Sequence, residues 1–294
     1  MKHTVFKKAN ILCFLFSFAA MLPLPGQELE TCTDSNCHGN LMGSKYVHGI
    51  AEESCETCHE RNSGAHPADF GREFSLTDSM PALCFMCHEE FTGAENIHQP
   101  VKDGDCAACH NPHSAEYETL LVGQIPDLCF TCHGWALGKQ VNKSENIEAK
   151  INGSSYVHAP AGGGECSFCH NVHASDHSYL LTYAFPKGLY AEGKKENYEL
   201  CFNCHDSDLL VDESGEAITE FRNNGKNLHY VHVKKEKGRS CSTCHNMHGS
   251  NNSHLLEEYI QFGDWKMPLN YKESEMGGTC WTGCHQRLDY DRSD

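Results

Sequence analysis

The sequence has few basic residues and few apolar stretches. It contains 23 lysine and arginine residues against 40 aspartate and glutamate residues, which gives a formal net charge of −17. This excess of negative charge disfavours binding to nucleic acid. The mean hydropathy is −0.53, and no apolar run after residue 26 is long enough to cross a bilayer as a helix. The composition therefore excludes a polytopic helical membrane protein, and it leaves little material for an ordinary apolar core.

The one long apolar run lies at the N-terminus. Lys2, Lys7 and Lys8 precede the run ILCFLFSFAAML, which stops before Pro23. A basic segment followed by a short apolar run is typical of a secretory signal peptide. We therefore predict a signal peptide over residues 1–26 and an exported, most simply periplasmic, protein. An uncleaved N-terminal anchor is the alternative.

The cysteines occur in pairs. Of 19 cysteines, 18 form nine closely spaced pairs, and a histidine follows each pair directly. Seven pairs have the spacing CxxCH, which is the signature of covalent c-type haem attachment. Zinc does not require a histidine after every pair, and a disulfide framework gives the histidines no role. The predicted attachment cysteines are Cys32, Cys37, Cys55, Cys58, Cys84, Cys87, Cys106, Cys109, Cys129, Cys132, Cys166, Cys169, Cys201, Cys204, Cys241, Cys244, Cys280 and Cys284.

Two of the nine pairs have unusual spacers. Four residues separate Cys32 from Cys37, and three separate Cys280 from Cys284. A disulfide is the alternative for each of these pairs, although the histidine is in place. We predict nine haems of c type, of which seven rest on unmodified motifs. The predicted proximal iron ligands are His38, His59, His88, His110, His133, His170, His205, His245 and His285.

The motif pairs repeat along the chain, and a repeat of this kind decides the fold. An upstream histidine, a CxxCH unit, a further histidine and a second unit recur four times, with a Leu-Leu pair in three copies. We predict a single-haem segment at residues 27–44 and two-haem modules at residues 45–95, 96–135, 156–205 and 229–294, the last with the C-terminal tail. About 30 residues per haem cannot build an apolar core. The expected fold is therefore mainly coil with short α-helices and few strands, packed around haem.

Further histidines supply the sixth ligand of each iron. The modules nominate His48, His66, His98, His113, His158, His173, His232 and His248, and the ninth ligand is left open among His177, His229 and His254. His113 follows His110 by three residues, which on a helix places both on one side. We therefore expect His113 to bind a neighbouring haem, most simply the haem on Cys129 and Cys132.

The doubled motifs of residues 32–285 resemble those of the multihaem c-type cytochromes. The resemblance implies non-enzymatic electron transfer through stacked haems outside the cytoplasm. Because two histidines saturate an iron, such haems only pass electrons. The alternative is a multihaem reductase of nitrite, hydroxylamine or a sulfur oxyanion with one open-coordinate haem, although no CxxCK motif occurs.

The acidic composition favours redox partner proteins with basic docking faces. The resemblance also leaves open insertion into an outer-membrane barrel and self-assembly. The expected location is accordingly periplasmic, with an outer-membrane-associated or extracellular location as alternatives.

Overall fold

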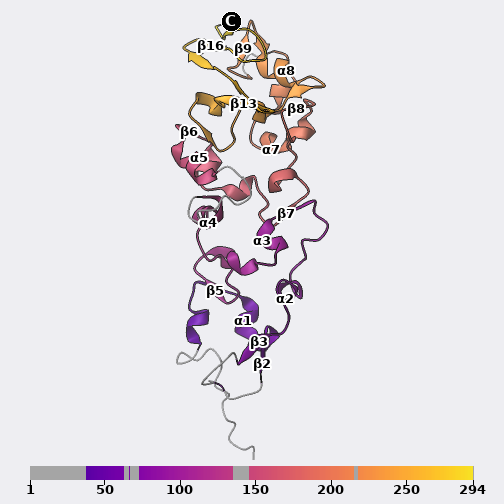
Figure 1. Cartoon of the computed structure of the whole chain (residues 1–294), viewed down its shortest axis with the longest axis vertical. Helices are drawn as coiled ribbons and strands as arrows, with labels where there is room; N and C mark the ends of the chain where they lie inside the picture. Colours follow the sequence, from indigo (N-terminus) through magenta and orange to yellow (C-terminus); the bar gives the residue numbers. More distant parts are fainter. Residues whose placement is uncertain (1–37, 63–65, 67–72, 135–145, 215–217, 294) are drawn as a thin grey trace, which may run out of the picture.

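The protein is an elongated rod in which the chain runs from one end to the other (Figure 1). The computed structural model describes residues 38–62, 66, 73–134, 146–214 and 218–293. The predicted signal peptide and the cysteines Cys32 and Cys37 lie outside the described residues. Successive parts of the sequence follow one another along the long axis, and the C-terminus lies at one end. The order of the sequence is therefore also the order in space.

The helices are short, as the repeat predicts. The longest in the described residues have seven residues. The α-helices are α1 (Gly49–Glu53), α2 (Ala82–Phe85), α3 (Gln99–Lys102), α4 (Asp127–His133), α5 (Ile147–Gly153), α6 (Ala159–Gly162), α7 (Glu199–Phe202) and α8 (Leu228–Val233). The first cysteine pair of each module instead starts a three-residue 3-10 turn: η2 (Cys55–Thr57), η3 (Cys106–Ala108), η5 (Cys166–Phe168) and η9 (Cys241–Thr243).

Three two-residue ladders join neighbouring modules. Strand β1 (Tyr46–Val47) pairs antiparallel with β5 (Ser114–Ala115). The same pairing joins β4 (Asn96–Ile97) to β7 (Ala174–Ser175) and β6 (Tyr156–Val157) to β12 (Gly249–Ser250). Each ladder thus connects the start of one predicted module to the middle of the next.

The remaining strands form small local pairs, most of them near the C-terminus. They are β2 (His59–Arg61) with β3 (Phe74–Leu76), β8 (Tyr190–Ala191) with β11 (Gly238–Arg239), β9 (Arg222–Asn223) with β10 (Lys226–Asn227), β13 (Tyr259–Phe262) with β14 (Trp265–Pro268), and the sheet β15 (Lys272–Ser274), β16 (Gly277–Cys280), β17 (Leu288–Asp291). The sheet order is β15-β16-β17. No described strand exceeds four residues, so the predicted fold class, mainly coil with short elements, is confirmed.

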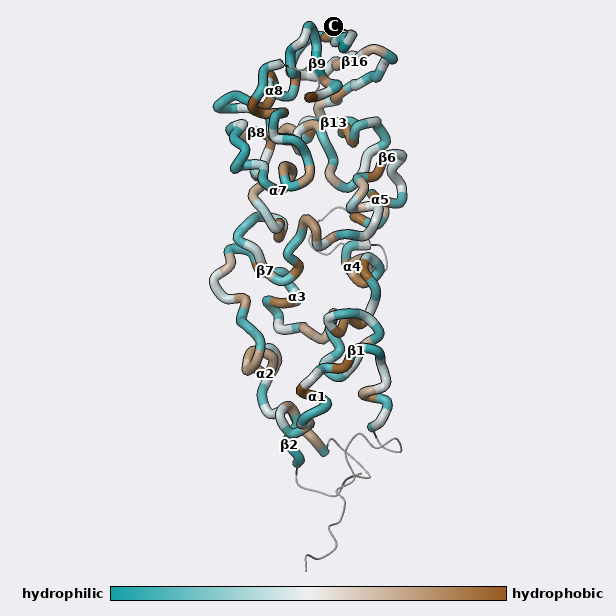
Figure 2. The backbone as a smooth tube through the Cα atoms, turned by 180° about the vertical axis from the view of Figure 1, so that it is seen from behind, coloured by the Kyte–Doolittle hydropathy of each residue, from teal (hydrophilic) through white to brown (hydrophobic). Residues whose placement is uncertain are grey.

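The polypeptide supplies little apolar core of its own. Only nine hydrophobic residues of the described chain are buried, and six of them form two clusters towards the C-terminus. One cluster contains Tyr198, Leu210 and Val233, and the other Ile260, Met267 and Leu269. Elsewhere the apolar segments are short and scattered along the backbone (Figure 2). Among the described residues, no helix is both long and apolar enough to span a membrane.

Candidate haem-binding sites

The histidines of the described chain lie opposite one another in pairs. In eight pairs the ring planes are within 25° of parallel and the ring centroids are 5.9 to 6.3 Å apart. The pairs are His38–His66, His48–His88, His59–His113, His98–His133, His110–His173, His158–His205, His170–His248 and His229–His245. Each pair joins one predicted proximal histidine to one histidine from elsewhere in the chain.

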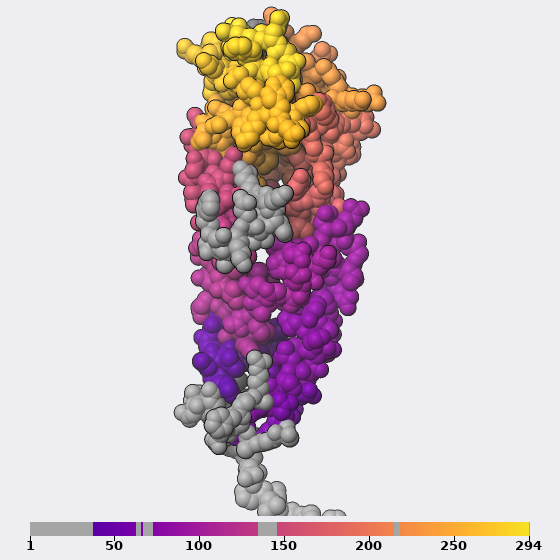
Figure 3. Space-filling model, in the orientation of Figure 1, coloured from indigo at the N-terminus to yellow at the C-terminus, as the bar shows by residue number. Residues whose placement is uncertain are grey.

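This separation fits one metal ion between two imidazoles. An imidazole nitrogen binds a metal at about 2 Å, and the ring centroid lies about 1 Å behind it, so the centroids of two opposed ligands are about 6 Å apart. Clusters of three or more metal-binding side chains, which zinc would need, do not form in the described residues. The space-filling view shows openings between the segments in the middle of the rod (Figure 3). The donor set therefore fits haem iron with two axial histidines.

Hydrogen bonds fix the orientation of the proximal rings. Nδ1 of His170 lies 2.9 Å from the carbonyl oxygen of Tyr179, and His110 and His245 make the equivalent contacts at 2.8 Å. An N–H donated from Nδ1 to a carbonyl leaves the lone pair of Nε2 free for a metal. These three rings are therefore prepared to bind iron through Nε2.

The Leu-Leu pair is part of the turn that supplies these carbonyls. Tyr179 and Leu180 have φ angles of 60° and 56°, in the left-handed region that L residues seldom adopt. The turn brings Leu181 back to form a β-bridge with His170. The same bridge joins His110 to Leu121 and His245 to Leu256. The repeated leucines thus mark the turn that orients the proximal histidine.

Each ladder between modules carries two distal histidines. The backbone N–H of His48 donates to the carbonyl of His113 at 2.8 Å. Equivalent bonds run from His98 to His173 and from His158 to His248, at 2.9 and 3.2 Å. Nδ1 of His48 lies 2.9 Å from the carbonyl oxygen of Pro112, on the partner segment. Backbone pairing therefore places one histidine from each of two modules side by side.

The two histidines of a ladder face the two CxxCH units of one module, as His48 faces His88 and His113 faces His59. The upstream histidine faces the second unit of its own module, as His98 faces His133. The downstream histidine faces the first unit of the preceding module, as His113 faces His59. His66 keeps this rule despite its altered spacing, because it faces His38 of the preceding single-haem segment. The expectation that His113 serves the haem on Cys129 and Cys132 is therefore wrong.

The helical argument behind that expectation also fails. Residues 111–113 form a bend, not a helix, and the Asn111 side chain accepts the backbone N–H of His113 at 3.0 Å. The bend turns His113 away from its own module and into β5. His110, in turn, faces His173 of the next module at 5.9 Å.

The fourth module departs from the rule. Its first proximal histidine, His245, faces His229 of helix α8. Burial and the imidazole of His245 lower the pKa of His229 to about 4, and iron binds the neutral form of imidazole. The sequence left His229 open among three candidates. The spacing of three residues between His229 and His232, both in α8, is the sequence signal that could have identified it.

His232 lies close to the last proximal histidine. Its pKa is lowered by burial and, less strongly, by the imidazole of His285. Nδ1 of His232 lies 2.6 Å from the carbonyl oxygen of Leu228, which leaves Nε2 free. The other two candidates, His177 and His254, face no imidazole ring in the part of the chain that the structure describes, and His254 instead pairs with Glu273 at 3.2 Å.

The cysteines connect neighbouring modules. All 16 described cysteines are free of disulfides. The thiols of Cys129 and Cys166, from successive modules, lie close enough to shift each other's pKa, and the same holds for Cys201 with Cys241, while burial and Cys106 raise the pKa of Cys84. The predicted attachment sites of successive modules are therefore neighbours across each module boundary.

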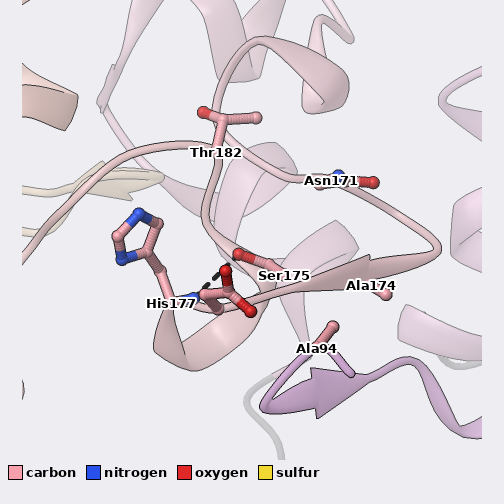
Figure 4. Close-up of a pocket in the computed structure, with 7 residues that line it drawn as sticks. Ala94, Asn171, Ala174, Ser175, His177 and Thr182 are labelled. Atoms are coloured by element: carbon pink, nitrogen blue, oxygen red, sulfur yellow. Dashed lines mark hydrogen bonds between the residues drawn. The ribbon is translucent and has the colours of Figure 1, made fainter. Parts of the chain in front are cut away.

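One surface hollow in the described residues does not resemble a substrate site. It has a volume of about 280 Å³ and lies beside the β4–β7 ladder, lined by Ala94, Asn171, Ala174, Ser175, Asp176, His177 and Thr182. Figure 4 shows Ala94 approaching from the neighbouring module, and the backbone N–H of His177 donates to Ser175 at 2.9 Å. The lining contains no lysine or arginine that could bind an oxyanion.

Comparison with known proteins agrees with the site geometry. The family model of the doubled CXXCH motif matches residues 48–93, 98–137 and 158–209. A multiheme cytochrome MtrA of Shewanella baltica (strain OS185) is 28% identical over 271 residues, which cover 85% of this chain and 71% of the relative. The motifs, the opposed histidines and these matches lead to one conclusion. The chain is a multihaem c-type cytochrome with doubled CXXCH motifs.

Proposed function

We propose that the chain binds nine c-type haems and carries electrons along the rod without catalysing a reaction of its own. The observation that carries the proposal is the series of opposed histidine pairs, which runs through successive modules from His38 to His245. A haem bound at each pair would accept or release one electron at its iron. The ninth site is assigned to His285, with His232 as its distal ligand.

The cysteines support an unbroken order of sites. Contacts across module boundaries join Cys84 to Cys106, Cys129 to Cys166 and Cys201 to Cys241. Within modules, burial raises the pKa of one thiol and the charge of another raises it further: Cys58 acts on Cys84, Cys132 on Cys109, Cys201 on Cys169 and Cys280 on Cys244. Attachment sites that follow one another in sequence are thus neighbours in space from Cys55 to Cys284. The chain's part in the function is to hold these sites close and in order.

The histidine pairs also argue against the reductase alternative. A reductase needs an iron with an open position beside acid–base or cationic residues. Every proximal histidine from His38 to His245 instead faces a second imidazole. The hollow beside β4 and β7 lacks a cationic side chain. Electron carriage is therefore the function that the geometry favours.

The charge distribution supports a partner with a basic face at the N-terminal half. Residues 31–133 contain 16 acidic and 4 basic residues, whereas residues 231–294 contain 9 acidic and 8 basic residues. Complementary charge speeds the encounter of redox partners. We propose that this encounter takes place outside the cytoplasm, in the periplasm or towards the cell exterior. The elongated shape of the chain also suits membership of an outer-membrane assembly.

Two measurements test the proposal. Intact mass of the purified protein should correspond to nine covalent haems, and a mass corresponding to seven would remove the sites at Cys32 and Cys280. Electron paramagnetic resonance of the oxidised protein should show low-spin iron only. A high-spin signal together with turnover of nitrite or hydroxylamine would overturn the carrier assignment in favour of a reductase.

A further inference from the structure

Arg239 is held in a fixed position near the C-terminal end of the rod. It lies in β11 directly opposite Tyr190 of β8, and its guanidinium carbon is 4.2 Å from the centre of the Tyr190 ring. Directly opposed residues of an antiparallel pair share one face of the sheet. The aromatic ring therefore supports the cation from one side.

The backbone around Arg239 has little freedom. A Cβ atom at Gly238 would lie 1.9 Å from the carbonyl oxygen of Val233, so the chain passes α8 in direct contact. On the other side, the backbone N–H of Ser240 donates to Leu189 at 3.0 Å and its hydroxyl donates to Gly188 at 2.7 Å. Ser240 is only 1% exposed. The point from which the Arg239 side chain projects is thus fixed.

The charge of Arg239 has no carboxylate partner in the described residues. Nη2 lies 3.5 Å from Sγ of Cys284, and Nη1 is buried without any hydrogen-bond acceptor. Arg239 as a whole is half-buried. Its position brings a cation next to an attachment cysteine of the last predicted haem site.

We propose that Arg239 raises the reduction potential of the C-terminal haems, above all that of the haem on Cys280 and Cys284. The inference rests on the proposed haem attachment at these cysteines. Reduction of iron(III) to iron(II) adds one electron and removes one positive charge, so a fixed cation nearby favours the reduced state. One nitrogen of the guanidinium is buried, so salt screens this interaction less than it would screen a fully exposed charge. An electron passed from the haem on Cys201 and Cys204 to the C-terminal pair oxidises the first iron and reduces the second.

The consequence is a direction along the rod. If the last haems hold electrons most strongly, electrons that enter elsewhere collect at the C-terminal end and leave from there. Acidic and basic residues nearly balance in residues 231–294, whereas acidic residues predominate in residues 31–133. This difference suits one partner that delivers electrons and a different partner that accepts them at the C-terminal end. The N-terminal half contains no comparable feature in its described residues. The two described arginines with a buried nitrogen that lacks a partner, Arg222 and Arg239, both lie in the C-terminal half.

The test is a redox titration of the whole protein followed by visible absorption. Arg239→Gln removes the charge and keeps a polar side chain of similar reach. We expect the midpoint potential of the most positive step to fall by about 59 mV, which corresponds to a tenfold change in the equilibrium constant of a one-electron couple. Arg239→Lys should keep most of the parent behaviour. Lys237→Gln removes an exposed charge two residues away and should change the titration little, because solvent screens exposed charges.

A second variant identifies the haem responsible for the most positive step, and it does not depend on whether Arg239→Gln folds. Cys280→Ser with Cys284→Ser removes the last haem and should remove the most positive step in an otherwise unchanged Arg239 background. The inference would be overturned if that step were retained, or if Arg239→Gln with its full haem content titrated like the parent protein. Neither result would affect the proposed electron-carrier function. A high-spin signal with turnover of nitrite or hydroxylamine in the parent protein would instead refute the proposed function itself.

Discussion

Replacing His113 by alanine should change one haem only, and not the one nearest in sequence. His113 faces His59 at 6.0 Å, whereas His110 of the same motif faces His173. The variant should therefore open the iron of the haem on Cys55 and Cys58. The bond from His48 to residue 113 uses the backbone carbonyl, so the β1–β5 ladder should persist. With nine haems bound, roughly one-ninth of the oxidised iron should become high-spin, because that iron loses one strong axial ligand.

The assay is electron paramagnetic resonance of the oxidised protein, with His177→Ala as the matched control. His177 faces no ring in the described residues and should give no high-spin signal. Adding Cys55→Ser and Cys58→Ser to His113→Ala should abolish the new signal, because these substitutions remove the affected haem. The comparison follows the logic of a double-mutant cycle. Adding Cys129→Ser and Cys132→Ser should leave the signal in place. A signal lost in the second combination and kept in the first would refute the pairing between modules.

Three further predictions concern folding and stability. Apoprotein without haem should lack a cooperative thermal transition in calorimetry, because only nine hydrophobic residues of the described chain are buried; a sharp transition would contradict this. Tyr179→Val should lower the free energy of unfolding by about 1–2 kcal/mol, since a β-branched residue resists a positive φ, whereas Tyr183→Val should cost less in the same denaturant titration. Hydrogen bonds from Ser253 and His254 lower the pKa of Glu273 from 4.5, so this contribution is present above that pH and is lost as pH falls through the lowered value. Glu273→Gln should lower the melting temperature at pH 7, and the difference should close in acid; a constant difference would exclude this origin.

The sequence was sufficient for the chemistry of the sites because that chemistry is local. A CxxCH unit places its cysteines and proximal histidine within one turn, and the backbone N–H of His170 indeed donates to the carbonyl of Cys166 at 3.0 Å. The same holds for the fold class, since the composition excludes a large polypeptide core. These features depend on neighbouring residues, which a motif records directly.

The assignment of distal histidines to irons could not be predicted in the same way. It depends on ladders of two residues, such as β1 with β5, whose members are too short to show a periodic pattern. The helical expectation for His113 failed because Asn111 forms a bend at that point. An i, i+3 pair on a helix does occur, but in α8, where His229 and His232 lie ahead of the first cysteine pair of the last module instead of after it.

The ladders between modules also bear on biosynthesis. The distal ligand of each first haem, such as His113 for the site at His59, lies in the module that follows along the chain. If the chain is exported with its N-terminus first, as proposed, a site such as that at His59 would lack its second histidine until the next module arrived. The sites would then gain their second histidine one after another along the chain. A pause in export would leave the most recent site with one histidine and an open iron. The histidine pair within the last module, His229 with His245, ends this dependence.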